Sequence, residues 1–170
     1  MYMILQECSL WKVAEIFFIE PTKVHFIKEI SRKIGLAHTS VKIHLQKLIK
    51  EGLAEEAYSA PFKGYKAIRE NSDFIFNKKI ANTILLKNSG LIEKLKEKYP
   101  KSIILFGSYD KGEDIENSDM DLFIDSKIFK FDQEKFEKFL KRKIHLIFKE
   151  EANKSLFESI NQGTILFGER

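Results

Sequence analysis

Apolar residues recur at helical spacing through the first third of the chain. Ahead of Pro21 they fall on one face of a predicted helix, at Leu10, Val13, Ala14, Phe17 and Phe18. A second helix is predicted over residues 28–34 and a third over the segment that ends at Gly52, with a break at Gly35 between them. The spacing therefore predicts three helices before any strand.

The ends of the third predicted helix carry recognisable boundary residues. We expect Thr39 or Ser40 to cap its start, and Gly52 suits the left-handed residue that follows a helix end. The stretch LAEEAYSAPFKGYKAI comes next and predicts two short strands around a Pro/Gly turn. A hairpin is thus expected directly after the third helix.

The second half predicts strands alternating with helices. Pro100 separates a helix near residues 90–98 from the apolar run at 103–106, which we interpret as a buried strand. The elements expected after it are strands at 122–124 and 144–148, a helix near 132–142 and a final helix through residues 155–168. The pattern indicates an α+β chain with a domain at 1–75, connecting helices at 76–100 and a second domain at 101–170.

Composition places the chain among globular proteins. Of 170 residues, 44% are apolar and 32% are charged, and three prolines with eight glycines exclude a low-complexity chain. The single cysteine, Cys8, excludes an internal disulfide, so we expect a reducing cytoplasm and interpret Cys8 as a buried small hydrophobe. The chain shows neither a secretory leader nor an apolar run long enough to cross a bilayer, so no membrane partner is expected.

Charge is unevenly distributed although the net charge is only +4. Residues 22–50 hold seven Lys or Arg against the single acid Glu29, whereas residues 110–125 hold seven acids against the single base Lys111. We therefore expect two sites with different partners, and we expect the acidic loop to need bound cations.

The basic segment resembles the winged helix-turn-helix regulators of bacteria and archaea over roughly residues 8–70. DNA binding by such a unit needs exposed side chains early in the third helix to reach base edges, with basic groups on the phosphates. The expected DNA-binding residues are His38, Thr39, Ser40, Lys42, Gln46, Lys47, Lys63 and Lys66. The alternative is that this unit docks protein rather than DNA.

The acidic segment carries the most specific motif. A strand ends at Gly107-Ser108, ten residues intervene, and Asp119-Met120-Asp121 opens the next strand. Alternate side chains of a strand share a face, so the two carboxylates lie about 7 Å apart and can bridge divalent metals. Gly107 permits close backbone approach, and Ser108 can meet phosphate oxygens at the start of a short helix.

This spacing resembles the nucleotidyltransferase superfamily of polymerase beta, and most closely its minimal nucleotidyltransferases, over about residues 80–168. The resemblance implies a mixed sheet with flanking helices. It implies that Gly107, Ser108 and Lys111 bind the triphosphate of an NTP, most simply ATP. Asp119 and Asp121 would be the catalytic residues and would hold Mg²⁺ or Mn²⁺. An acceptor hydroxyl would attack the alpha-phosphorus and release pyrophosphate.

Two positions depart from that family pattern. Asp110 replaces a small residue, and His145 stands where a third carboxylate is usual in the strand at 144–148. Imidazole suits manganese better than magnesium. Glu150 or Glu151 reaches the site only if that strand ends early.

Two functions follow from these patterns, and a third is weaker. The first is an enzyme that transfers NMP from an NTP to a macromolecular acceptor, with a protein such as a toxin as one candidate. The second is a DNA-binding regulator whose degenerate nucleotidyltransferase domain binds nucleotide or mediates assembly. The third is an interaction scaffold with neither activity.

A homodimer through the first helix, with Trp11, Phe17 and Phe18, is a further expectation.

Overall fold

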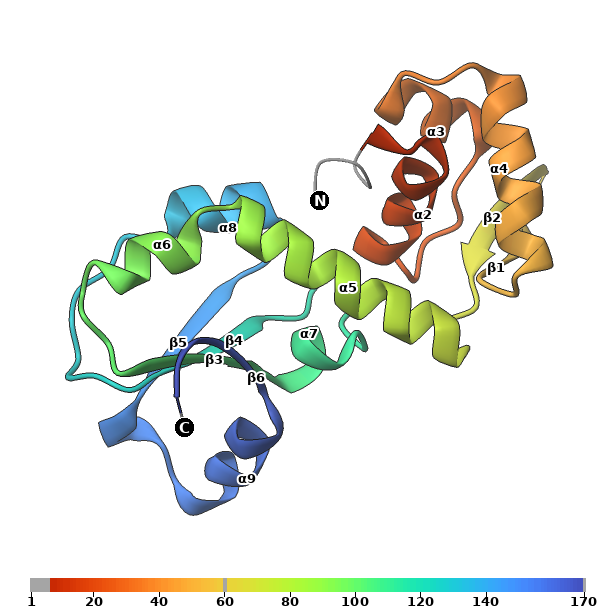
Figure 1. The fold of residues 1–170 in the computed structure, drawn as a ribbon. Helices are drawn as coiled ribbons and strands as arrows, with labels where there is room; N and C mark the ends of the chain where they lie inside the picture. Colours follow the sequence, from red (N-terminus) through yellow and green to blue (C-terminus); the bar gives the residue numbers. More distant parts are fainter. Residues whose placement is uncertain (1–6, 60, 170) are drawn as a thin grey trace. The chain divides into compact units, whose positions relative to one another are not determined.

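The computed structural model describes residues 7–59 and 61–169 (Figure 1). The chain divides into two compact units, one up to Ala81 and one from Asn82 onward. Within the described residues there are eight α-helices and two sheets, which confirms the α+β class. No helix in this part of the chain combines the length and apolar character needed to cross a membrane.

Three helices form most of the first unit. They are α2 (Ser9–Ile19), α3 (Ile27–Ile34) and α4 (His38–Lys50). Their apolar faces meet in one core, which contains Val13 and Phe17 from the predicted face of the first helix together with Ile30, Val41, Leu45 and Leu48. Gly35 follows α3 in the left-handed region (φ +67°), and Gly52 follows α4 at φ +69°. The helical spacing and both glycine stops are confirmed.

The predicted cap of the third helix is wrong. The N-cap residue is Ala37, and its side chain cannot accept a hydrogen bond from the first turn. Thr39 and Ser40 lie inside that turn, because the helix begins at His38. The packing of Val41 and Leu45, rather than a polar cap, sets the start of α4.

The hairpin follows α4 as expected. Strands β1 (Ala54–Ser59) and β2 (Phe62–Ala67) pair antiparallel. Gly64 lies inside β2 rather than in the turn. Glycine is needed at this place in the strand, because a Cβ on residue 64 would come within 2.5 Å of Val24 Cγ1. The neighbouring His25 exchanges two backbone hydrogen bonds with Tyr65, of 2.7 and 2.8 Å, so the segment before α3 is joined to the hairpin by one isolated β-bridge.

Two expectations for the first helix are corrected. Phe17 and Phe18 are only 1% and 2% exposed, so they fill the core of their own unit and offer no surface for a dimer. Cys8 is exposed rather than buried, because it precedes the first residue of α2.

A long helix, α5 (Ser72–Asn88), contains the point at which the two units divide. Asn71 starts it, since its side-chain oxygen accepts from the backbone N–H groups of Asp73 and Phe74 at 2.7 and 3.1 Å. The predicted helix near residues 90–98 is α6 (Leu91–Lys96), which follows Gly90 at φ +72°.

A four-stranded mixed sheet organises the second unit, in the order β5-β4-β3-β6. Strand β3 (Ser102–Phe106) pairs antiparallel with both β4 (Met120–Ile124) and β6 (Thr164–Gly168), and β4 pairs parallel with β5 (Ile144–Phe148). The remaining elements are the short helix α7 (Gly107–Lys111), α8 (Glu134–Leu140), the 3₁₀ turn η1 (Lys149–Glu151) and α9 (Lys154–Gln162).

Both faces of this sheet are covered by apolar contacts. Ile103 and Leu105 face one core with Leu91, Leu95 and other side chains of α6 and α8. The alternate strand residues face a smaller core with α9, made of Ile104, Phe106, Phe123, Ile147 and Ile160. Phe139 is 52% exposed, because it lies on the outer side of α8.

The predicted final helix is wrong in its second half. Helix α9 ends at Gln162, and the segment after it is strand β6 at the edge of the sheet. Gly163 makes this switch possible, because a Cβ there would come within 2.4 Å of the Leu105 carbonyl oxygen and 2.9 Å of Phe106 Cβ. The chain therefore passes close against β3 before β6 pairs with it.

We expect Gly163→Ala to destabilise the second unit by about 2–3 kcal/mol, because the added methyl group meets backbone that cannot yield. Urea unfolding of the full chain measures the destabilisation. Gly35→Ala is the control, since it introduces a left-handed alanine with no atom within 4 Å and should cost only about 1 kcal/mol. Equal destabilisation by the two variants would contradict the close contact.

Candidate functional site

The turn from β3 into α7 is built around Gly107. Strand β3 is buried along its whole length, and the chain leaves it at Gly107 with φ +78°. A Cβ at this position would lie 2.6 Å from Asp121 Oδ2. Glycine is therefore required twice, for the backbone angle and for the approach to the carboxylate.

Strand β4 presents Asp121 to this turn. Phe106 pairs with Asp121 across the two strands, which brings the end of β3 beside the carboxylate. Met120 and Leu122 are fully buried, whereas the Asp121 side chain is 27% exposed. Asp119 immediately precedes β4 and is exposed. The predicted alternation of inward and outward residues is confirmed.

His145 lies beside Asp121 on the neighbouring parallel strand. The two residues are register partners, and His145 Nδ1 is 3.3 Å from Asp121 Oδ1. The imidazole thus occupies the position predicted for it on the third strand. Glu150 and Glu151 follow the far end of β5, and Glu151 turns back to accept from the Phe148 backbone N–H at 2.9 Å. Neither glutamate replaces His145.

The other predicted nucleotide-binding residues lie on α7. Ser108 is half-buried in its first turn, and its carbonyl accepts from the Glu113 backbone N–H at 2.9 Å. Lys111 is exposed in the last turn, and Gly112 ends the helix at φ +76°. Gly107, Ser108 and Asp121 are therefore neighbours, while Lys111 lies one helical turn further on.

The loop between α7 and β4 is held by a buried polar network. Asp114 Oδ1 accepts from Asn82 Nδ2 at 2.7 Å, and Asp114 Oδ2 accepts from the Arg142 guanidinium at 3.1 Å. Asn82 also donates to the Tyr109 carbonyl at 2.9 Å. Burial and the Asp114 carboxylate raise the pKa of the Tyr109 hydroxyl, so this tyrosine stays neutral.

This network corrects the interpretation of the acidic loop. Asp110 and Asp114 are 5% and 1% exposed, and Arg142 balances the charge of Asp114 within the unit. Asp114 therefore has its counter-charge within the unit and needs no bound cation. Asn82 and Arg142 were not predicted from the sequence, because neither forms part of a local motif.

A cavity of about 450 Å³ adjoins Asp119. Its walls come from the loop before β4, from α8 and from the residues that follow α8. The charged residues that line it are of both signs: Glu116, Asp119, Glu134, Glu137, Lys138, Lys141, Arg142 and Lys143. The Ile144 backbone N–H and Lys143 lower the pKa of Glu137, and Glu137 in turn raises the pKa of Lys143. The opening beside Asp119 is thus polar, with Glu137 and Lys143 both ionised at neutral pH.

The residues expected to bind DNA lie on α4 and β2 of the first unit. On α4, His38, Thr39, Lys42, Gln46 and Lys47 are exposed and Ser40 is half-buried. On β2, Lys63 Nζ lies 2.6 Å from Glu56 and Lys66 Nζ lies 3.0 Å from Glu55. The hairpin lysines are therefore already paired with glutamates of the adjacent strand.

Breaking the Asp114–Arg142 pair should be costly. We expect Arg142→Met to lower the free energy of unfolding by about 3 kcal/mol or more, because it leaves a buried carboxylate without its cation. The double variant with Asp114→Asn should cost less than the sum of the single variants by at least about 1 kcal/mol. Urea unfolding measures the cycle.

The exposed pair Lys94–Glu97 provides the control cycle, with Lys94→Met and Glu97→Gln. It should show a coupling of less than about 1 kcal/mol. Additive effects at Asp114 and Arg142 would contradict the network.

Residues 89–166 match the family model described as "Nucleotidyltransferase domain". No curated protein and no solved structure matches the chain. The matched segment begins just before α6 and contains β3, α7, β4, α8, β5, α9 and most of β6, and hence every site residue described for the second unit except Asn82. The chain therefore contains a nucleotidyltransferase domain over residues 89–166.

Proposed function

We propose that the chain is a divalent-metal-dependent nucleotidyltransferase that moves NMP from an NTP, with ATP as the simplest donor, to a macromolecular acceptor. The observation that supports this most is the close approach of Gly107 to Asp121. It brings the turn assigned to the triphosphate next to a carboxylate assigned to the metal. In the reaction, an acceptor hydroxyl oxygen bonds to the alpha-phosphorus and the bond to the leaving pyrophosphate breaks.

Asp119 and Asp121 are the proposed ligands of the divalent ion. Their carboxylate oxygens suit Mg²⁺, and His145 Nδ1 adds a nitrogen donor that Mn²⁺ accepts more readily. The donor set therefore fits a divalent ion, which when bound offsets the negative charge of the phosphates. The Ser108 backbone at the start of α7 and the Lys111 ammonium would contact the phosphate oxygens.

The first unit is the proposed DNA-binding part, in the form of a winged helix. That assignment is supported by three helices followed by a hairpin, to which the segment before α3 is joined by the His25–Tyr65 bridge. Lys42 and Lys47 on α4 make no ion pair within the described residues, unlike the two hairpin lysines. We therefore assign the main phosphate contacts to α4, with Lys63 and Lys66 contributing only if they exchange their glutamate partners for phosphate.

One observation favours a second candidate function. His145 faces Asp121 at 3.3 Å where a third carboxylate would complete the site. The second candidate is that the second unit binds nucleotide without transferring it. Together with the proposed DNA-binding first unit, this would make the protein a DNA-binding regulator. A protein acceptor, such as a toxin, belongs to the first candidate.

Thermal unfolding with ATP and either Mg²⁺ or Mn²⁺ tests the nucleotide site. A ligand at about a hundred times its Kd adds roughly 2.7 kcal/mol, or several degrees. We expect the double variant Asp119→Asn/Asp121→Asn to lose the metal-dependent shift. Glu150→Gln/Glu158→Gln, with the same change in charge on the same unit, should keep it. An unchanged unfolding temperature of the wild-type protein would contradict nucleotide binding. A raised unfolding temperature without pyrophosphate release in the presence of acceptor would favour the second candidate.

Two glycine variants serve as the matched geometric control for this experiment. Gly107→Ala and Gly90→Ala both place alanine at positive φ, +78° and +72°, but the added Cβ meets Asp121 at position 107 and open space at position 90. The nucleotide shift should disappear in Gly107→Ala and persist in Gly90→Ala.

Salt dependence tests the DNA assignment. Removing one phosphate contact lowers the slope of log K against log salt by about 0.9. Lys42→Ala/Lys47→Ala should therefore weaken binding to duplex DNA and flatten that slope by roughly 2. The control, Lys94→Ala/Lys96→Ala, removes two lysines that pair with Glu97 and Glu93 in the other unit and should leave the slope unchanged. An unchanged slope in the first variant contradicts the assignment.

A further inference from the structure

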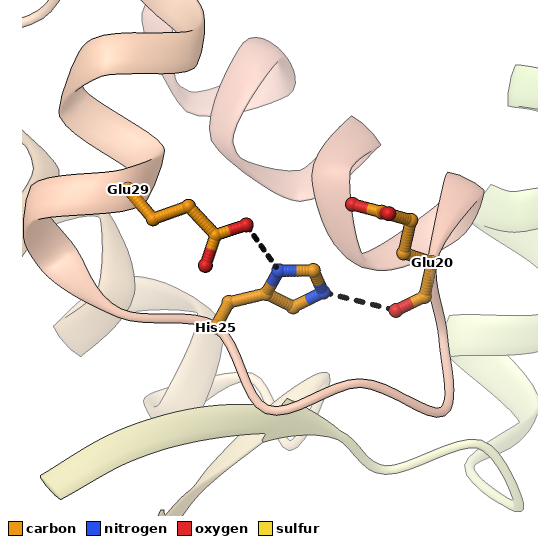
Figure 2. Close-up of side chains that lie close together, drawn as sticks. All are labelled: Glu20, His25 and Glu29. Atoms are coloured by element: carbon orange, nitrogen blue, oxygen red, sulfur yellow. Dashed lines mark hydrogen bonds and ion pairs between the residues drawn. The ribbon is translucent and has the colours of Figure 1, made fainter. Parts of the chain in front are cut away.

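Three side chains that no part of the proposed function uses gather in the first unit. Glu20 follows the end of α2, His25 lies in the segment before α3, and Glu29 lies in the first turn of α3. One ligand atom from each lies within 4.8 Å of the other two. Figure 2 shows the His25 ring between the Glu20 backbone carbonyl and the Glu29 carboxylate.

The hydrogen bond at Nε2 fixes the tautomer of His25. Nε2 lies 2.9 Å from the Glu20 carbonyl oxygen, and a carbonyl oxygen only accepts, so the proton is on Nε2. In the neutral ring the lone pair is then on Nδ1. Histidines that bind metals almost always donate their other ring N–H in this way, often to a backbone carbonyl.

Nδ1 is left in an unusual environment for a buried atom. The His25 side chain is 1% exposed, and Nδ1 has no hydrogen-bond partner among the described residues. The Glu29 Oε1 atom lies 3.8 Å from it. A lone pair facing a carboxylate at this distance is unfavourable unless a proton on Nδ1 or a metal ion lies between them.

The two glutamates already attract a cation. Lys33 Nζ lies 2.6 Å from Glu20 Oε2 and 2.8 Å from Glu29 Oε1, and Lys23 also pairs with Glu20. Burial raises the pKa of Glu20, but the two lysines outweigh it and bring the pKa to about 2 from an ordinary 4.5. Both carboxylates are therefore ionised at neutral pH. The Lys33 side chain is 42% exposed, so it can turn into solvent and free the oxygens.

We propose that Glu20, His25 and Glu29 form a binding site for a first-row divalent transition metal of the zinc class. Nδ1 and two carboxylate oxygens are the donors such an ion takes, whereas Mg²⁺ disfavours the imidazole. Tetrahedral coordination with bonds of about 2.0–2.1 Å separates ligand atoms by roughly 3.4 Å. The 3.8 Å contact therefore closes by a few tenths of an ångström, and the other separations, which are within 4.8 Å, close by at most about 1.4 Å through rotation of the Glu20 and Glu29 side chains. Both glutamates are partly exposed, which leaves the fourth position to water.

The ion would link three parts of the first unit. The ligands come from the end of α2, from the residue that pairs with Tyr65 of the hairpin, and from α3. Metal binding is thus expected to stabilise the first unit independently of nucleotide binding by the second.

Titration of the full chain with Zn²⁺ at pH 7, followed by calorimetry, tests this site. All variants carry Asp119→Asn, Asp121→Asn and His145→Gln, which together remove the proposed metal donors of the second unit. We expect His25→Gln and Glu29→Gln each to weaken Zn²⁺ binding by at least about tenfold. Glu56→Gln, which removes an ion-paired glutamate elsewhere in the same unit, should leave it unchanged.

Lys33→Met separates a metal site from a purely structural ion-pair cluster. Removing the competing ammonium should strengthen Zn²⁺ binding by about tenfold, because Zn²⁺ then does not have to break the ion pairs of Lys33 with the two glutamates. It also keeps the proposal testable if His25→Gln does not fold. X-ray absorption at the zinc edge should show one imidazole and oxygen ligands. The absence of Zn²⁺ binding, equal affinities across the variants, or weaker binding in Lys33→Met would each overturn the proposal.

Discussion

The register of β3 against β4 is the constraint on which the candidate site of the second unit depends. Phe106 pairs with Asp121, and this pairing alone places Gly107 beside the carboxylate. The buried neighbours Met120 and Leu122 hold the register, because a slip of one residue would expose both and bury Asp121. Apolar packing thus fixes the position of a charged group, and the parallel strand β5 then sets His145 beside it.

Local patterns were sufficient for most of the fold. Helical spacing located α2, α3 and α4, and the apolar runs located β3, β4 and β5. The alternation around Asp119 and Asp121 also predicted which residues face inward. These features depend on neighbours within a few positions, which a single sequence contains.

The features that were not predicted depend on contacts between distant residues. The apolar run of β6, Ile165–Phe167, fits a helix as well as a strand, and the feature that directs it to the sheet is the close passage of Gly163 against Leu105, fifty-eight positions earlier. Asp114 belongs to an acidic run in the sequence, but Arg142 and Asn82 bury and neutralise it. In the hairpin, counting lysines overestimates the charge offered to DNA, because strand pairing places Glu55 opposite Lys66.

Gly107 makes two positions in the chain depend on each other. Any side chain at 107 meets both a left-handed backbone and the oxygen of Asp121, so relieving one penalty leaves the other. A change that shortens residue 121 would remove the steric obstacle but also the carboxylate. Substitutions at the two positions are therefore expected to occur together in homologues. A homologue that lacks glycine at 107 is expected to lack the aspartate at 121 as well.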